Sequence, residues 1–224
     1  MSRAGRVRPF EGAPVPARLR LLPPTSDRTK PLEPDAPTAD RLRALRARDS
    51  SAERWLIGAH WARVERILFR ILGDVRHLED LTQEVFVRVF ARIEDVTEPE
   101  SLRPFVTSVT VFVAREAIRK ARRHRWLSFL APEDLPDVGA GDDDDAREAL
   151  AAFYRIVRTL DPDERVAFTL RFVEGLELSA VAAACGVSLA TIKRRLARAE
   201  TRFIERCRGD EALRPWLEEG DRWA

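Results

Sequence analysis

The stretch from Glu177 to Leu196 constrains the fold of this chain more than any other. An alanine-rich run leads to Gly186, then to Ser188, and then to a segment with many cationic side chains. A glycine can end a short helix in the left-handed conformation, and a serine hydroxyl can cap the next helix, which is the layout of a helix-turn-helix. Side chains spaced to fill the corner between the helices are Val181, Val187, Ile192 and Leu196. Since the second helix of such a motif can enter a DNA major groove, the stretch indicates DNA binding; an ordinary helical hairpin with a solvated basic face is the alternative.

Charge is distributed unevenly along the chain, although the net value is small. The 224 residues carry 39 lysines and arginines and 37 aspartates and glutamates, a formal net charge of +2. Residues 115–125 and 193–208 are strongly cationic, whereas residues 133–148 are strongly anionic. This asymmetry indicates separate surfaces with different partners.

The cysteines and histidines form neither a disulfide framework nor a metal-binding pattern. Cys185 and Cys207 stand apart, and Cys185 falls within the expected hairpin, where a small buried thiol fits. The histidines, His60, His77 and His124, are scattered without ligand spacing. A glycine-rich phosphate loop and a nucleophile with its base are also missing from the sequence. We therefore predict no metal, no cofactor and no enzymatic activity.

Residues 1–48 differ in composition from the rest of the chain. They are rich in proline and arginine and poor in large apolar side chains. Such a stretch cannot bury enough apolar area to offset its ordering entropy, so a disordered, solubilising extension is expected, whose arginines could touch nucleic acid weakly. No secretory signal is recognisable, and no apolar run approaches the ~20 residues that span a bilayer, which predicts a cytoplasmic protein.

Apolar residues recur at helical spacing in the next part of the chain. Trp61, Val64, Leu68 and Ile71 mark one helix that ends at Gly73. A second helix is marked by Leu78, Leu81, Val85, Val89 and Ile93, and a third is expected over residues 102–126. The β-branched run 106–113 admits a strand, but its cationic continuation is helical and no partner strand is in sight.

The sequence therefore predicts an all-α fold with two small helical domains joined by an acidic flexible linker. The linker is expected over residues 131–148, which carry prolines, glycines and four consecutive aspartates at 142–145. The domains then span residues 49–130 and 149–208, the second containing the helix-turn-helix, with a C-terminal extension over 209–224 and a short helix around Trp216. In the second domain, Asp161 and Pro162 open a helix whose first turn carries two acidic residues.

Together the two domains resemble the extracytoplasmic-function sigma factors, the small two-domain initiation subunits of bacterial RNA polymerase. In the second domain the resemblance is carried by residues 160–165, 171–176, 186–188 and 191–199. In the first domain it is carried by residues 72–74 and 79–90 and by the basic helix beyond Phe105. The resemblance covers roughly residues 55 to 207.

The resemblance implies that the helix bearing Asp80, Gln83 and Glu84 docks on the polymerase core. These polar side chains share one face of the expected helix, opposite its apolar residues. Carboxylates and an amide in so compact a patch suit an arginine-rich partner. Without the resemblance, the same pattern is that of a solvated helix face.

The resemblance also implies that both domains contact promoter DNA. The third helix of the first domain would hold one opened strand of the −10 element, with candidates Phe112, Arg115, Arg119, Lys120, Arg122 and Arg123. The second helix of the hairpin would read the −35 element, with candidates Thr191, Lys193, Arg194, Arg195 and Arg198. Sequence alone does not sort base contacts from phosphate contacts. Phe112 replaces an asparagine that is usual in the family, which puts the −10 preference and strand opening in doubt.

Two alternatives to a sigma factor remain open at this point. One is a helix-turn-helix regulator that acts without polymerase, and the other is a sigma-like protein that docks on polymerase but melts promoters poorly. The resemblance also implies that an anti-sigma factor could be a partner. The aspartates at 142–145 either mimic RNA in a polymerase channel or form a self-repelling spacer.

Overall fold

The computed structural model describes residues 38–73, 77–125 and 144–213, with the backbone alone at 123–125 and 144–147. Every regular element in these ranges is helical, which confirms the all-α prediction. The helices are α1 (Ala39–Arg46), α2 (Ser50–Leu72), α3 (Leu78–Ala91), α4 (Leu102–Arg125), α5 (Asp144–Val157), α6 (Pro162–Phe168), α7 (Leu178–Cys185) and α8 (Leu189–Arg208). Short 3-10 turns cover Ile93–Asp95 and Pro99–Ser101, and a π-helical turn, Thr169–Val173, extends α6.

Helices α2, α3 and α4 form the first domain, and local signals set their ends. The Asp49 carboxylate caps α2 by accepting hydrogen bonds of 2.9 Å from the amides of Ser51 and Ala52. Gly73 ends α2 with a φ of 61°. The residues 106–113 lie within α4, so the strand alternative is excluded.

The prediction that residues 1–48 are disordered is wrong for its last part, because residues 39–46 form α1. The Thr38 hydroxyl caps this helix, and the side chains of Leu42 and Leu45 are buried against the first domain. Arg46 donates a hydrogen bond to the carbonyl of Val96. A cap followed by two leucines three residues apart was the signal for this helix. Residues 1–37 lie outside the described ranges.

Helices α5 to α8 form the second domain. Gly186 ends α7 with a φ of 64°, and the Ser188 hydroxyl accepts a hydrogen bond from the amide of Thr191, so the predicted turn and cap are confirmed. Asp161 occupies the N-cap position of α6, but its carboxylate makes no capping hydrogen bond and binds Arg202 instead. The predicted linker boundary at 148 is wrong, because α5 already begins at Asp144. Residues 126–143 and 214–224 are outside the described ranges.

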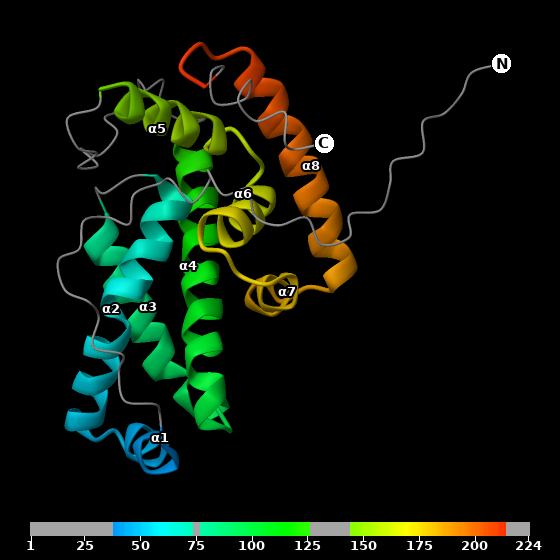
Figure 1. The fold of residues 1–224 in the computed structure, drawn as a ribbon. Helices are drawn as coiled ribbons and strands as arrows, with labels where there is room; N and C mark the ends of the chain where they lie inside the picture. Colours follow the sequence, from blue (N-terminus) through cyan, green and yellow to red (C-terminus); the bar gives the residue numbers. More distant parts are fainter. Residues whose placement is uncertain (1–37, 74–76, 126–143, 214–224) are drawn as a thin grey trace.

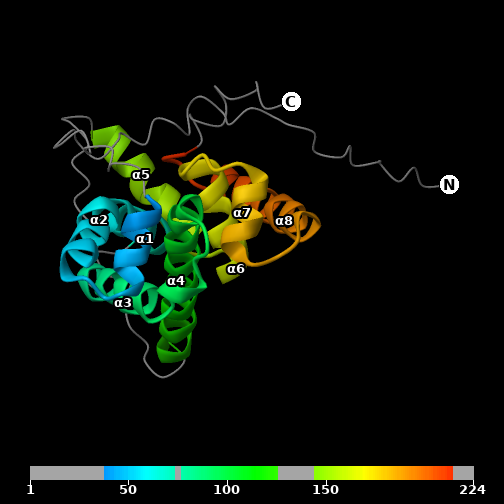
Figure 2. The ribbon, with the colours of Figure 1, turned by 90° about the horizontal axis from the view of Figure 1, so that it is seen from below.

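The two domains lie against each other, with α4 between them (Figures 1 and 2). Helices α2 and α3 pack on one side of α4, and α6 and α7 pack on the other. Buried apolar side chains of both domains belong to one continuous cluster. None of the helices in the described ranges is long and apolar enough to cross a membrane.

Candidate nucleic-acid and polymerase interface

The predicted polymerase-docking residues lie on the outer face of α3. The side chains of Asp80 and Gln83 are exposed, and Glu84 is half-buried. Val87, one turn beyond Gln83 on the same face, is 62% exposed, which is unusual for a large apolar side chain. The spacing of four residues from Gln83 was the signal for this residue, which the sequence prediction missed. The patch is therefore polar at one end and apolar at the other.

Arg88 connects this face of α3 to α4. Its guanidinium pairs with Glu84 and with Glu116, each at 2.5 Å, and these hydrogen bonds raise the pKa of Arg88. The guanidinium carbon also lies 5.0 Å from the centroid of the Phe112 ring, within range of a cation–π interaction. Phe112 is 52% exposed, so part of its ring remains available to a partner.

The cationic residues predicted on α4 do not share one face. Arg119 and Lys120 are exposed to solvent. Arg115 is partly buried and Arg122 remains exposed, but both reach the second domain, and the side chain of Arg123 is not described. Arg115 donates a hydrogen bond of 3.1 Å to the carbonyl of Cys185. Arg122 donates one of 2.9 Å to the carbonyl of Leu160.

Helix α8 has one buried face and one exposed cationic face. Ile192 and Leu196 are buried, as predicted for the core of the hairpin. On the outer face lie Lys193, Arg194 and Arg198, with Thr191 half-buried at their N-terminal end. A guanidinium nitrogen of Arg194 donates a 3.4 Å hydrogen bond to the Thr191 hydroxyl.

Arg195 is the member of the predicted −35 set that faces inward. Its guanidinium pairs at 2.7 Å with the carboxylate of Asp163. The other oxygen of Asp163 lies 3.0 Å from Arg115. The structure thus brings together on one carboxylate two arginines from the two predicted DNA surfaces. The sequence prediction gave Asp163 a role only at the helix terminus and missed this contact, which depends on the packing of the domains.

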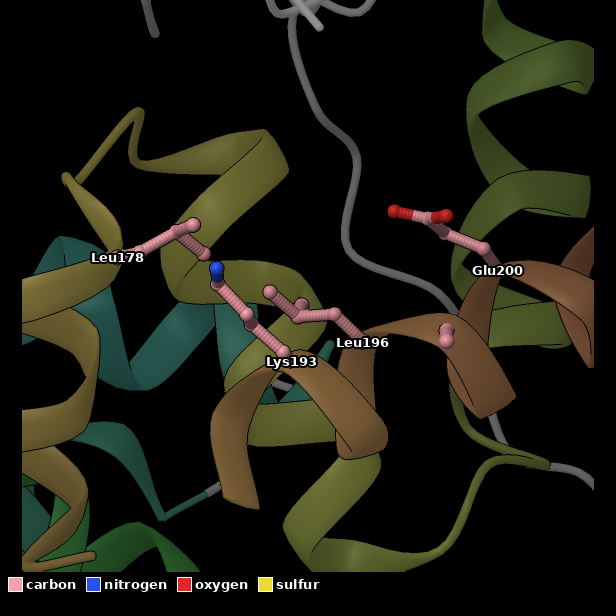
Figure 3. Close-up of a pocket in the computed structure, with 5 residues that line it drawn as sticks. Leu178, Lys193, Leu196 and Glu200 are labelled. Carbon is pink, nitrogen blue, oxygen red and sulfur yellow. The ribbon is translucent and has the colours of Figure 1, made fainter. Parts of the chain in front are cut away.

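A small hollow lies beside α8. Leu178, Leu196 and Ala197 line it, together with the polar side chains of Lys193 and Glu200 (Figure 3). Burial raises the pKa of Glu200, and Arg171 opposes that shift. Within the ranges that the structure describes, no group of three histidine, cysteine, aspartate or glutamate side chains could hold a metal ion.

The buried surroundings of both cysteines indicate a structural role. Both lie buried, and burial raises the pKa of the Cys185 thiol. Burial raises the pKa of Cys207 to about 12. Because the thiolate is the reactive form, neither side chain is suited to nucleophilic or ligating chemistry.

Models of two regions of the sigma-70 family match the two domains of this chain. The model of Sigma-70 region 2 matches residues 56–124, and that of Sigma-70 region 4 matches residues 150–203. The chain is 32% identical over 143 residues to the probable RNA polymerase sigma-C factor of Mycobacterium bovis, covering 62% of this chain and 75% of that protein. It is 30% identical over 172 residues to the ECF RNA polymerase sigma factor SigE of Mycolicibacterium smegmatis, covering 73% of this chain. The match spans 65% of the length of SigE, slightly less than two thirds.

A solved structure with a similar fold is the sigma factor RpoE in complex with the anti-sigma factor NepR from Bartonella quintana. The TM-score is 0.55 at 22% sequence identity, and the match covers 69% of this chain and 96% of that one. At this level of identity the likeness supports the fold.

Proposed function

The chain belongs to the extracytoplasmic-function (ECF) family of RNA polymerase sigma factors, and we propose that it binds the polymerase core, recognises promoter DNA and helps to open its strands. In this role the chain works in the bacterial cytoplasm and performs no catalysis itself. Two surfaces on one chain carry the proposal. Helix α3 exposes a face with carboxylate and amide side chains, and the capped helix α8 exposes a cationic face.

We assign the polymerase contact to Asp80, Gln83 and Glu84. A protein interface gains most from a desolvated apolar centre flanked by polar groups, and Val87 supplies that centre beside the three polar side chains. Carboxylates on such a rim favour arginines on the partner. Glu84 is already held by Arg88, so its geometry is fixed before the partner arrives.

We assign the −35 contact to the outer face of α8. Thr191, Lys193 and Arg194 lie in its N-terminal half, which is the part of a recognition helix that reaches base edges. Arg198 lies one turn further on and suits a phosphate contact. Arg195 belongs to this surface only when it leaves Asp163.

We assign the −10 contact to α4. The exposed Phe112 ring offers a surface on which an extruded base can stack, while Arg119 and Lys120 suit the phosphates of the opened strand. Arg115 joins them only when the domains separate, whereas Arg122 is already 45% exposed beside Asp161, and the backbone places Arg123 next along the helix.

An anti-sigma factor is a further proposed partner, because the solved RpoE structure holds one. Such an inhibitor would compete for the α3 face or for the outer face of α8. We place it below polymerase and DNA in this proposal, since no described surface of the chain identifies it.

The test is in-vitro transcription with bacterial core polymerase, the purified chain and a library of candidate upstream regions. We expect transcripts that depend on the chain and disappear in the triple variant Asp80→Ala, Gln83→Ala, Glu84→Ala. The matched control is Glu205→Ala with Glu211→Ala, which removes exposed acidic side chains from the second domain and its end.

Other outcomes select the alternatives. Core binding without transcripts, from a folded sample, favours a sigma-like protein that melts promoters poorly. The phenylalanine at position 112 would then be the first residue to test as the cause. Neither core binding nor transcripts would leave a helix-turn-helix regulator that acts without polymerase.

A further inference from the structure

The described part of the chain exposes three large apolar side chains, and each lies on a surface proposed to bind a partner. Val87 is on the face of α3 proposed to bind polymerase, and Phe112 is on the helix proposed to hold the −10 element. The third is Leu189, which is 44% exposed in the first turn of α8. An exposed leucine needs no explanation on an ordinary surface, but this one lies at the end of the helix proposed to read DNA.

The packing of the hairpin depends little on Leu189. Val187, two residues earlier, packs against the hydrophobic core, and Ile192 is fully buried. The Ser188 hydroxyl caps α8 by accepting a hydrogen bond from the amide of Thr191, so the backbone fixes Leu189 as the first residue of the helix. The Leu189 side chain therefore projects from a well-defined helix end that is held in place by other residues.

The neighbours of Leu189 on the exposed surface of α8 are small or cationic. Lys193 follows Leu189 by one helical turn, and Arg194 follows Ala190 in the same way. All three of these neighbours are exposed. Because Cα–Cβ bonds tilt toward the N-terminus of a helix, Leu189 and Ala190 form an apolar tip with the two cations behind it. This arrangement suits a helix whose first turn reaches the bases while its cations contact phosphates or further base edges.

The base edges in a major groove offer such an apolar tip one kind of partner. Guanine, adenine and cytosine present hydrogen-bond donors and acceptors there, whereas thymine presents one acceptor and its C5 methyl group. A leucine side chain neither donates nor accepts, so against a polar edge it would displace water without replacing the lost hydrogen bonds. Against a thymine methyl group it buries apolar surface on both partners. The chemistry of Leu189 therefore favours thymine over the other bases.

We propose that Leu189 is a specificity-determining residue, which contacts the C5 methyl group of a thymine in the −35 element. Lys193 and Arg194 hold the helix in the groove through phosphates or neighbouring base edges, and Leu189 selects the thymine. The inference rests on the proposed function, because it takes α8 to be the helix that enters the major groove. It adds to that role a preference for one base, which contacts to phosphates do not supply.

The experiment removes the methyl group from the DNA, one thymine at a time. The −35 element is first located from the transcripts that the chain and core polymerase produce from the library of upstream regions. Each thymine of that element, on both strands, is then replaced by uracil, which lacks only the C5 methyl group. Fluorescence anisotropy of a labelled promoter duplex, with each uracil duplex as competitor, gives the affinities for polymerase that carries the full chain.

We expect uracil at one position to weaken binding by the parent about fourfold, the amount for burying one methyl group. In Leu189→Ala this uracil penalty should disappear, while the effect of uracil at the other positions stays as in the parent. The control is Lys193→Ala, which should weaken binding to the thymine and uracil duplexes by the same factor and so preserve the penalty. Because Leu189 is exposed, its replacement should leave the chain folded, which circular dichroism verifies.

The proposal is overturned if the −35 element contains no thymine, if the parent binds every uracil duplex as tightly as the thymine duplex, or if the penalty persists in Leu189→Ala. If Leu189→Ala instead weakens binding to core polymerase and leaves the uracil penalty intact, the leucine contacts protein and the proposal is equally wrong. A failure of the proposed function is seen separately, because the library then yields no transcripts that depend on the chain.

Discussion

Helices α4 and α8 are both proposed to contact DNA, but packing leaves different parts of their cationic surfaces exposed to solvent. Helix α8 packs through Ile192 and Leu196, and most of its cationic side chains face solvent. Helix α4 lies between the two domains, so packing occupies several of its faces and divides its cationic side chains. The difference shows when the exposed cationic side chains of a helix can be predicted from sequence: only when its apolar residues define a single buried face.

The largest effect that tests this comparison is expected at the buried face of α8. Ile192→Ala should lower the free energy of unfolding by about 2–5 kcal/mol, because the side chain is fully buried and leaves a cavity. Leu189→Ala, in the first turn of the same helix where the side chain is 44% exposed, is the matched change and should have less effect on stability. Urea denaturation followed by circular dichroism measures both. Equal losses would contradict the difference in burial between these two positions.

The domains should also differ in their response to mild acid. Burial lowers the pKa of His60 in α2 to about 4, and the charges of Arg63 and Arg103 act in the same direction. Because the unfolded chain binds this proton near pH 6.5, stability falls as the pH drops from about 6.5 to 4, by about 3 kcal/mol. His60→Gln should flatten this part of the curve, measured by urea denaturation at several pH values.

The exposed His77 supplies the matched control, since it lies outside the core of the first domain. His77→Gln should leave the dependence between pH 6.5 and 4 as in the parent. If both histidine variants behaved alike, His60 would not be the group that destabilises the first domain in acid.

At the DNA surface of α8, Arg194 offers the sharpest specificity test. Arg194→Ala should cost about 1–3 kcal/mol of discrimination at one base pair of the −35 element if the guanidinium reads a guanine. A phosphate contact would instead weaken all sequences alike. Competition binding against a set of single-base-pair changes separates these results. The control is Arg206→Ala, an exposed arginine in the last turn of the same helix.

The fold was predictable where the signals are local, and the site only in part. Gly186 and Ser188 act on the backbone next to them, so the turn and cap of the hairpin follow from the sequence. Helix α1 was missed because its local signal is only a cap and two leucines, and its stability depends on packing against α2 and the turn Ile93–Asp95. The division of the α4 arginines was not predictable, because it depends on Asp163, which lies far along the sequence and reaches Arg115 only through domain packing.

The smallest expected effect concerns the outward side chains of α4. Arg119→Ala and Lys120→Ala remove exposed charges that take no part in the contacts between the two domains, so neither should change the compactness of the chain. Each should reduce the salt dependence of DNA binding by the polymerase-bound chain by about one unit of slope, the amount for one phosphate contact. Arg115→Ala should differ from both, because it also removes an ion pair with Asp163 and a hydrogen bond to the Cys185 carbonyl in the second domain, so the free chain should become more extended. Titrations of promoter DNA at several salt concentrations, with scattering on the free chain, distinguish the two classes. If Arg119→Ala extended the chain as Arg115→Ala does, the faces of α4 would not have the separate roles that their packing indicates.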